Sequence, residues 1–304
     1  DLVRSRGLGD VYKRQQQYFF VSATIQSIVR KHRAEYGTLR NFHLKHVIQI
    51  NDTHPTLVIP ELMRILLDVE GYSWNDAWNI VTHTVAYTNH TVLAEALERW
   101  PQGLIENLLP RIWQILKEIA ARYQRTLEQH FHGDQSKVSK MAIIWNGEVR
   151  MANLCVCACY AVNGVSALHS EILKQDVFHD AYTMHPEQFK NVTNGVDHRR
   201  WLSQINPKLD VLVKECTGGD DYLLHPEAIR GLEKYKDDQS VLSQLEAIKK
   251  ENKRRFAAYV ARESGVQLNT DAVFDVQVKR LHEYKRQLLN VLHIIHLYLS
   301  LIHI

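Results

Sequence analysis

Residues 46–71, HVIQINDTHPTLVIPELMRILLDVEG, decide the fold. The apolar run His46–Ile50 has the length of a buried strand, and the polar loop Asn51–Pro55 follows it. After Pro60, which suits the first turn of a helix, apolar residues recur at i, i+3, i+4 and i+7 until Gly71 ends the pattern. A short strand, a polar loop and an amphipathic helix in succession predict an α/β fold.

The same patterns predict further elements outward from this stretch. Helices are expected from Ser73, which has Asp76 three residues later, over Arg111–Thr126, over Met151–Lys174 with a break at Asn163-Gly164, and around Leu288–Ile295. A hairpin is expected in Ile143–Arg150, because Asn146-Gly147 favours a tight turn. Phe274–Val278 (FDVQV) alternates apolar and polar residues and is predicted to be a strand.

The composition is that of a soluble globular protein. The 304 residues are 45% hydrophobic and 23% charged, enough for two domains with a sizeable core. The 37 basic and 34 acidic residues leave a formal charge of +3, which argues against binding to nucleic acid or to an anionic membrane. No apolar run approaches the roughly 20 residues that span a bilayer.

The four cysteines predict reduced thiols in a cytoplasmic protein. Cys155, Cys157 and Cys159 lie two residues apart in an apolar run, and Cys216 stands alone. Residues i and i+2 of a helix point in different directions, so this spacing is poor for zinc. We therefore expect no metal site.

Both ends of the sequence look foreign to the rest. Residues 1–15 (DLVRSRGLGDVYKRQ) and 299–304 (LSLIHI) resemble translated read-through of a sequencing adapter. We expect both to be non-native and leave them out of the fold prediction.

The cluster KRLHEYKR, residues 279–286, is the most informative candidate site. It lies where the predicted strand 274–278 meets a predicted helix, the position at which open α/β sheets bind ligands and helix ends favour anions. Arg280 is suited to hold a phosphate through two hydrogen bonds, with Lys279 and Lys285 as point charges. A solvated basic turn explains the same residues equally well. HEYK is not a zinc-binding HExxH motif.

Four other polar segments are weaker candidates. Asp52 or His54 is suited to act as a general base, although a helix cap is the favoured role of Asp52. Thr88–Thr91 (TNHT) is equally ambiguous. Glu95 and Glu98 are interpreted as structural, because the paired carboxylates of glycosidases normally come from different elements. Residues 191–201 (NVTNGVDHRRW) form a loop that ends in an aromatic residue suited to packing or stacking.

Taken in order, several strings resemble the glycogen/starch phosphorylase family. They are QINDTHP (49–55), AYTNHTV (86–92), EALERWP (95–101), HSEILK (169–174), TNG (193–195), RRWL (199–202) and FDVQVKRLHEYKRQLLN (274–290). The resemblance covers residues 17–298.

The resemblance implies two Rossmann-like domains of the glycosyltransferase B type, both incomplete. Residues 16–194 correspond to the later part of the amino-terminal domain. Residues 195–298 correspond to the start of the carboxyl-terminal, coenzyme-binding domain. The implied activity is phosphorolysis of terminal α-1,4-linked glucose from glycogen or starch, with retention, giving glucose 1-phosphate.

The resemblance also implies a role for each matching residue. Pyridoxal phosphate is the implied cofactor, and its 5′-phosphate serves as acid and base. Lys279 and Trp201 match cofactor-binding residues, and Arg280 and Lys285 match residues that hold the substrate phosphate. Tyr284 matches a contact to the glucosyl or phosphate group. The residues implied to bind the glucosyl unit are His90, whose carbonyl faces the anomeric centre, and Asn194.

The expected partners are an α-1,4-glucan such as glycogen, inorganic phosphate and a second copy in a homodimer. The lysine that anchors the coenzyme in the family lies beyond residue 304, so the chain alone is expected to be inactive. Arg30 and Lys31 match an activating-nucleotide site of allosteric members, and Arg111 matches a glycogen-holding surface where Lys117 replaces an aromatic residue. Val196-Asp197-His198 departs from the Ile-Thr-Pro often found after TNG. The alternatives are a nucleotide-sugar transferase and a catalytically inactive glucan-binding homologue.

Overall fold

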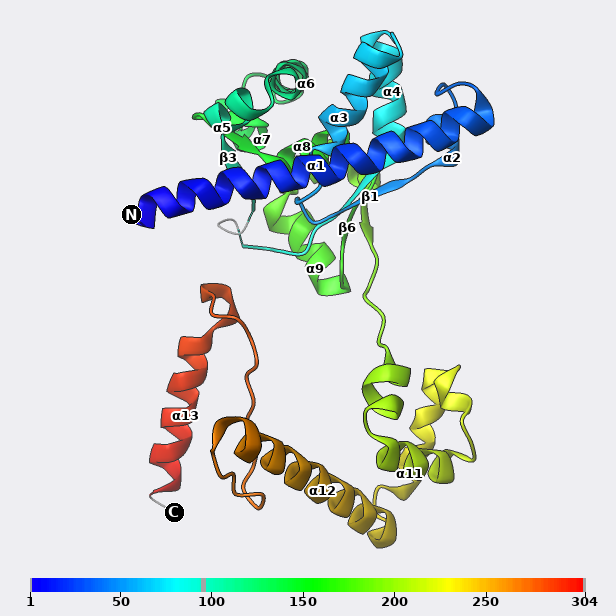
Figure 1. Ribbon diagram of the computed structural model, residues 1–304, viewed down its shortest axis with the longest axis vertical. Helices are drawn as coiled ribbons and strands as arrows, with labels where there is room; N and C mark the ends of the chain where they lie inside the picture. The colour runs from blue at the N-terminus through cyan, green and yellow to red at the C-terminus, as the bar shows by residue number, and fades with distance from the viewer. Residues whose placement is uncertain (1, 94–96, 303–304) are drawn as a thin grey trace. The chain divides into compact units, whose positions relative to one another are not determined.

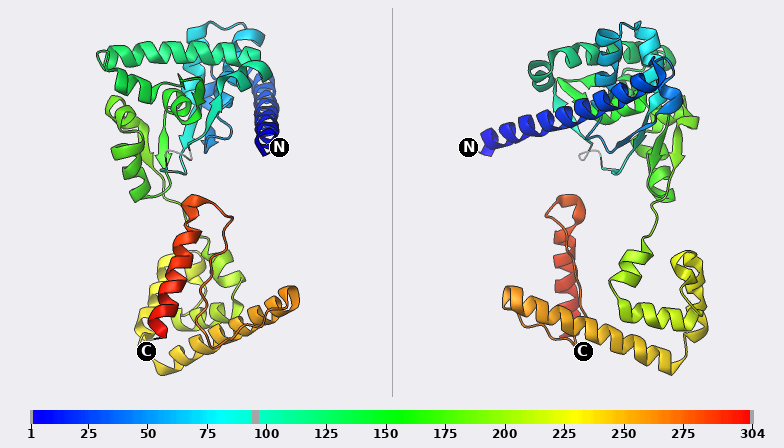
Figure 2. Two further views of the ribbon diagram at one scale, coloured as in Figure 1. Left: turned by 90° about the vertical axis from the view of Figure 1, so that its left-hand side faces the viewer. Right: turned by 45° about the vertical axis from the view of Figure 1, so that its right-hand side comes forward.

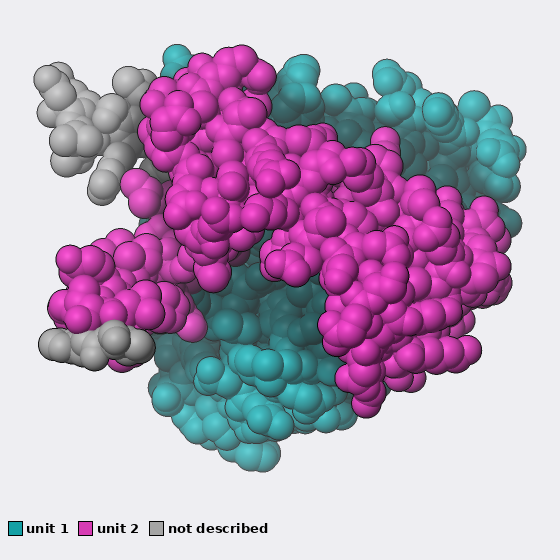
Figure 3. All heavy atoms as spheres, turned by 90° about the horizontal axis from the view of Figure 1, so that it is seen from below, with its two compact units in different colours: residues 1–194 teal, residues 195–304 magenta. Residues whose placement is uncertain are grey.

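The computed structural model describes residues 2–93 and 97–302, and the chain divides into two compact units. Unit 1 comprises residues 1–194 and unit 2 comprises residues 195–304 (Figure 3). Among the described residues, no helix is both long enough and apolar enough to cross a membrane.

Unit 1 is built on a four-stranded parallel sheet. Its strands lie in the order β1-β2-β6-β7 and comprise β1 (Ile48–Asn51), β2 (Val85–Thr88), β6 (Val162–Gly164) and β7 (Phe189–Asn191). The strand predicted at residues 46–50 is confirmed as β1, which begins two residues later and ends one residue later. Ile50 of β1 lies opposite Tyr87 of β2, and both side chains are fully buried. The central strand β2 (VAYT) has three buried residues in succession, as expected for a parallel strand covered on both faces.

The segment predicted as a broken helix over residues 151–174 contains a strand. Helix α8 (Met151–Ala158) ends before β6, and helix α9 (Ala167–Ile172) follows it. The predicted break at Asn163-Gly164 therefore lies within β6. Three residues are too few to show a period of two, and their pairing with β2 and β7 sets their conformation.

The helices after β1 follow the predicted pattern closely. Helix α3 (Val58–Arg64) continues as a π-helical turn (η1, Ile65–Val69), and helix α4 (Trp74–Thr84) begins after its cap Ser73. The Ser73 hydroxyl accepts a hydrogen bond from the Asp76 backbone N–H at 3.1 Å, so the predicted cap is confirmed. The other short helical elements of unit 1 are α2 (Phe42–Lys45), α5 (Gln102–Leu108), α7 (Gln135–Met141), η3 (Leu173–Val177), α10 (His179–Met184) and η4 (Pro186–Gln188).

The long helix α1 (Leu2–Tyr36) crosses unit 1 (Figure 1). It packs against α3 through Glu61, whose fully buried carboxylate accepts hydrogen bonds from the Tyr18 hydroxyl at 2.9 Å and the Ser22 hydroxyl at 2.7 Å. The Arg64 guanidinium, 2.8 Å away, pairs with the same carboxylate. Burial raises the pKa of Glu61, but these hydrogen bonds outweigh burial and hold it below its usual value.

The carboxyl-terminal end of α1 is held by a pair of histidines. Nδ1 of His32 lies 2.9 Å from Nε2 of His46, and Nε2 of His32 lies 3.0 Å from Oδ1 of Asn41. The His32 side chain is buried. This contact joins α1 to the chain that enters β1.

The helix predicted over residues 111–126 is confirmed as α6 (Pro110–His130). Its apolar stripe is buried along Ile112, Ile115, Leu116 and Ile119. The predicted hairpin is also confirmed, because β4 (Ile144–Trp145) and β5 (Glu148–Arg150) pair antiparallel. Asn146 and Gly147 both have positive φ (50° and 75°), as this tight turn requires. β5 also pairs with β3 (Arg99–Pro101), completing a second, three-stranded sheet.

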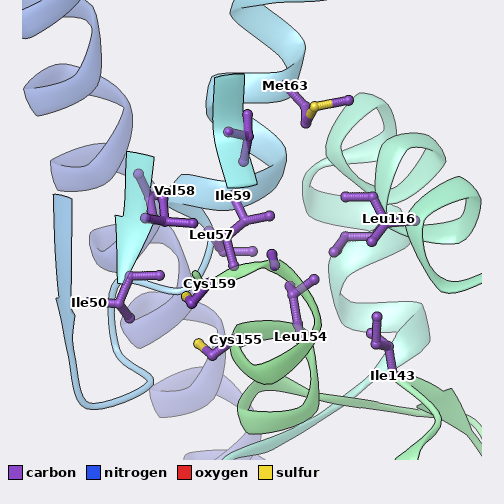
Figure 4. Close-up of a cluster of buried hydrophobic side chains, with 14 of the residues drawn as sticks. Ile50, Leu57, Val58, Ile59, Met63, Leu116, Ile143, Leu154, Cys155 and Cys159 are labelled. Atoms are coloured by element: carbon purple, nitrogen blue, oxygen red, sulfur yellow. The ribbon is translucent and has the colours of Figure 1, made fainter. Parts of the chain in front are cut away.

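The core of unit 1 joins α3 to α8. Figure 4 shows Leu154, Cys155 and Cys159 gathered with Leu57 and Ile59, and all five side chains are buried. Cys155, Cys157, Cys159 and Cys216 are free thiols, as predicted. Burial raises the pKa of the Cys159 thiol, so it stays protonated within the core.

The regular secondary structure of unit 2 is entirely helical within its described residues, 195–302. Its elements are η5 (Arg199–Gln204), α11 (Pro207–Thr217), η6 (Asp221–Leu223), η7 (Pro226–Tyr235), α12 (Gln239–Ser264), η8 (Glu283–Lys285) and α13 (Gln287–Leu301). An irregular segment joins α12 to α13 (Figure 2). The helix predicted around Leu288–Ile295 is confirmed as part of α13.

The strand predicted at Phe274–Val278 is wrong, because these residues are irregular. A strand requires a neighbour to pair with, and residues 195–302 contain no other strand. The segment instead packs through Phe274, whose ring centroid lies 6.1 Å from that of Phe256 and 4.9 Å from Nζ of Lys253.

Candidate functional site

The carboxyl ends of the four parallel strands bring several predicted candidates to one edge of the sheet. The loops that follow β1, β2 and β7 contain Asp52 and His54, His90, and Asn194, respectively. All four strands run in the same direction, so these loops share the sheet edge at which α/β proteins bind ligands. The sequence predicted these residues separately, and the topology brings their loops together.

His90 lies in the loop after β2 with its side chain exposed. Its Nε2 is 2.5 Å from Oδ1 of Asn51, the last residue of β1. The preceding residue, Asn89, is fully buried and orders the turn by accepting a hydrogen bond from the Thr91 backbone N–H at 2.9 Å. An exposed polar side chain therefore projects from a loop with a rigid, buried base.

Asn194 lies in the loop after β7, and its side chain is also exposed. Its backbone N–H donates to the Val165 carbonyl at 3.0 Å, and the Val192 N–H donates to the Gly164 carbonyl at 3.2 Å. Both bonds continue from the end of β6. Because β6 lies between β2 and β7, it separates the strands that lead to His90 and Asn194.

The favoured role of Asp52 as a helix cap is wrong. The N-cap of α3 is Leu57, five residues further on, because a series of turns separates β1 from the helix. Asp52 has a positive φ of 62°, and its carboxylate accepts from the adjacent Thr53 N–H at 2.6 Å. The side chain of His54 is exposed.

Glu98 makes structural contacts, as the sequence predicted. Its carboxylate lies 3.1 Å from Nζ of Lys13, 3.7 Å from Arg14 and 3.0 Å from the Thr53 hydroxyl. Burial raises the pKa of Glu98, but the charges of Arg14 and Lys13 outweigh it and keep the pKa low. Glu95 lies outside the described residues. Lys13 and Arg14 belong to the stretch predicted to be non-native, and that assignment stays a prediction.

The basic cluster 279–286 lies in unit 2, before α13. Lys279 and Arg280 are in the irregular segment, and Lys285 ends η8. The expected strand is absent, so only the helical half of the predicted strand-to-helix junction forms. Lys279 and Arg280 are exposed and Lys285 is partly exposed, and within the described chain none of the three is ion-paired with a carboxylate. Arg286, the N-cap of α13, adopts a left-handed conformation with φ of 58°.

The two aromatic candidates also lie in unit 2. Tyr284 belongs to η8, with its ring centroid 4.6 Å from that of His282 and 5.5 Å from Nζ of Lys285. Trp201 belongs to η5 and is 64% exposed, so it is available for stacking rather than packed in a core. The structure thus gathers Lys279, Arg280, Tyr284 and Lys285 in one segment, with Trp201 elsewhere in the same unit.

The residues considered for regulation lie on unit 1. Arg30 lines a groove of about 480 Å³ formed by α1 and Leu108-Leu109. Arg111 makes two hydrogen bonds with Asp68, at 2.5 and 2.8 Å, and Nζ of Lys117 lies 5.6 Å from the Trp113 ring. Arg111 is thus held by a carboxylate of unit 1.

Sequence reasoning missed one polar network at the same sheet edge. The Thr88 hydroxyl donates to Oδ1 of Asn163 at 2.8 Å, and Nε2 of His169 lies 3.0 Å from Oδ1 of Asn89. The string HSEILK was part of the family resemblance, but His169 received no role. A usable signal was Ser166, which precedes His169 by three residues and caps α9. The described residues contain no cluster of side chains suited to bind a metal.

The fold and the candidate site define the class of this protein: an α/β protein with a parallel sheet whose carboxyl edge carries exposed polar side chains. The profile of the carbohydrate phosphorylase family matches residues 7–303, so the chain belongs to that family. It is 46% identical over 290 residues to the glycogen phosphorylase of Bacillus subtilis (strain 168). It is also 46% identical over 301 residues to the muscle forms of glycogen phosphorylase from Mus musculus and Homo sapiens.

These relatives are much longer than the chain. Each match covers 95% of this chain but only 36% of the relative. The chain therefore spans about a third of the length of the relatives that it matches.

Proposed function

We propose that the chain is part of an α-glucan phosphorylase, a hexosyltransferase. In the complete enzyme it would release terminal α-1,4-linked glucose from glycogen or starch as glucose 1-phosphate, with retention of configuration. The observation that carries this proposal is the 46% identity to glycogen phosphorylases across 95% of the chain. The loops at the sheet edge and the cations of unit 2 support it independently.

The sugar-binding role is assigned to the loops after β2 and β7. His90 and Asn194 are exposed at the carboxyl edge of the sheet, and their loops are held by backbone hydrogen bonds and by buried Asn89. Preorganised polar groups of this kind orient a sugar and stabilise charge that develops at its anomeric carbon. In this proposal the His90 carbonyl faces that carbon.

The phosphate-binding role is assigned to the cluster 279–286. Lys279, Arg280 and Lys285 are cations without carboxylate partners among the described residues, a donor set that suits phosphate dianions. They also fit pyridoxal phosphate, with Lys279 holding its phosphate and Trp201 beside it. When bound, this coenzyme supplies a phosphate that exchanges a proton with the substrate phosphate. Arg280 and Lys285 would bind and orient the substrate phosphate, and Tyr284 would contact it or the glucosyl unit.

The rest of the proposal concerns the complete protein. Residues 16–194 and 195–298 would be parts of two Rossmann-like domains of the glycosyltransferase B type, in a cytoplasmic, homodimeric and allosteric enzyme. The 304 residues alone would be inactive, because they correspond to 36% of a phosphorylase.

The test is the phosphate dependence of the full-length enzyme after Arg280→Ala. Alanine cannot replace two charge-assisted hydrogen bonds, so we expect a loss of about 2–4 kcal/mol in transition-state stabilisation and a raised KM for phosphate. Arg280→Lys should recover only part of the loss, and the KM for glucan should change little. The matched control is Arg262→Ala, which removes an exposed arginine of α12 in the same unit.

An unchanged phosphate dependence in Arg280→Ala would show that the basic cluster has another role. If the unaltered full-length protein binds glycogen but releases no glucose 1-phosphate, the chain belongs to an inactive glucan-binding homologue.

A further inference from the structure

Two consecutive residues of α9, His169 and Ser170, are connected to the two loops that are assigned to sugar binding. His169 is partly buried and contacts Asn89 in the loop after β2, whereas Ser170 is buried and contacts Asn191, the last residue of β7. No role was assigned to either residue above.

The contacts of His169 fix its protonation state. The Val165 backbone N–H donates to Nδ1 of His169 at 3.1 Å, so Nδ1 must be the unprotonated acceptor. The proton of the neutral ring is therefore on Nε2, which donates to Oδ1 of Asn89 at 3.0 Å. Burial lowers the pKa of His169, and the charge of His90 lowers it further. A hydrogen bond with the Thr91 backbone opposes these effects but does not outweigh them, so the ring is neutral.

Asn89 transmits this contact to the loop that carries His90. Its Oδ1 accepts from both His169 and the Thr91 backbone N–H, and its Nδ2 donates to the Tyr87 hydroxyl at 3.0 Å. Asn89 and Tyr87 are both fully buried. The backbone on each side of His90 is thus connected, through one amide, to α9.

Ser170 makes the corresponding contact on the other side. Its hydroxyl donates to Oδ1 of Asn191 at 2.7 Å, and Nδ2 of Asn191 donates to the Thr193 hydroxyl at 3.2 Å. Gly164 allows Ser170 to approach this closely. A Cβ atom at Gly164 would lie 2.6 Å from Oγ of Ser170 and 2.9 Å from its backbone nitrogen.

We propose that His169 and Ser170 are positioning residues, which set the placement of the His90 loop relative to the Asn194 loop for binding of the glucosyl unit. This inference rests on the function proposed above. Neither residue is assigned a contact with the substrate. Each acts through an asparagine: the buried Asn89 for His169 and the exposed Asn191 for Ser170.

The first test separates the two hydrogen bonds of His169 in the full-length enzyme. An asparagine oxygen can take the place of Nδ1 and keep the Val165 contact, whereas a glutamine amide can take the place of Nε2 and donate to Asn89. His169→Asn should lower kcat/KM for glycogen at least tenfold and leave the KM for phosphate within twofold. His169→Gln should recover most of the loss. Ser170→Ala should lower kcat/KM for glycogen about threefold or more.

The matched control is His179→Asn, because His179 is an exposed histidine on the neighbouring helix α10. Kinetics of His169→Asn equal to those of this control would overturn the proposal. An increase in the KM for both glycogen and phosphate, together with a lowered melting temperature, would also overturn the proposal. That result would indicate a general structural role for His169.

The second test does not depend on catalysis. Hydrogen exchange of the full-length protein should show faster exchange of the Thr91 amide in His169→Asn than in the wild type or in His179→Asn. If wild-type enzyme releases no glucose 1-phosphate, the proposed function fails. The exchange of Thr91 still decides whether His169 holds this loop, and unchanged exchange would refute that role.

Discussion

Unit 1 and unit 2 differ in how they bury apolar residues. Unit 1 encloses a parallel sheet between helices, and its core includes fully buried Ile50, Leu62 and Tyr87. Among the described residues of unit 2, the buried apolar side chains are Leu212, Val213, Tyr222 and Val241. Helix α12 instead borders a groove of about 610 Å³ lined by Leu245, Phe256 and Phe274. Burial of apolar surface is the main source of folding stability, so unit 1 should contribute most of the stability of the chain.

The largest expected difference concerns hydrogen exchange. Amides of β1, β2 and β6 should be protected by the global stability of unit 1, whereas amides of α12 and α13 should exchange through local opening. We expect protection factors at least about 100-fold higher in the sheet, corresponding to about 3 kcal/mol. Exchange of the 304-residue chain followed by mass spectrometry measures both. Equal protection factors in the two units would contradict the inference that unit 1 is the more stable unit.

A smaller effect is expected from removing one buried carboxylate. Glu61→Ala leaves Arg64 and the Tyr18 hydroxyl without their partner inside unit 1, which should cost about 3–5 kcal/mol of unfolding free energy. The control in unit 2 is Glu251→Ala, which removes an exposed ion pair with Lys208 and should change the unfolding free energy little.

Urea unfolding of the 304-residue chain measures both variants of this pair. Trp201 is the only one of the six tryptophans that follows residue 194, so a Trp201→Phe background makes the fluorescence report on unit 1 alone. An equal loss from Glu61→Ala and Glu251→Ala would contradict the difference in burial between the units.

The smallest expected effect is a pH dependence of the stability of unit 1. Burial and the charge of His32 hold the pKa of His46 below its usual value, although Glu35 opposes this. The unfolded chain therefore binds a proton near pH 6.5 while the folded chain does not, so stability falls as the pH drops below about 6.5. Because His46 is partly exposed, we expect a loss of less than about 1 kcal/mol between pH 7.5 and 5.5.

His46→Gln should reduce this pH dependence, because a glutamine amide can donate to Nδ1 of His32 without titrating. His130→Gln, at an exposed position of α6, serves as the control. Urea unfolding midpoints at pH 7.5 and 5.5 measure the effect. If stability changes as much with pH in His46→Gln as in the wild type, the pH dependence arises from another group.

The sequence predicted those elements whose signals are local. The Ser73 cap, the apolar stripe of α6 and the Asn146-Gly147 turn each depend on neighbouring residues, and all three are confirmed. The strand β6 was missed because pairing with β2 and β7 determines it. The predicted strand at Phe274–Val278 has the correct alternation but no partner strand among residues 195–302.

The candidate site was predictable residue by residue but not as an arrangement. His90 and Asn194 were singled out from the polar segments and the family resemblance, yet they lie 104 positions apart in the sequence (194 minus 90). Only the order β2-β6-β7 shows that their loops leave neighbouring parts of one sheet. His169 was overlooked because its role depends on a buried partner, Asn89, that lies 80 positions away.

The close approach of Ser170 to Gly164 has a consequence for mutational tolerance. The clash of an added Cβ with the Ser170 backbone does not depend on the identity of the new side chain, so it acts against alanine and tryptophan alike. In a saturation library at residue 164, selection for an intact loop after β7 should return glycine almost alone. Libraries at Gly103 and Gly195, where open space surrounds the position of a Cβ, should return a broad spectrum of residues.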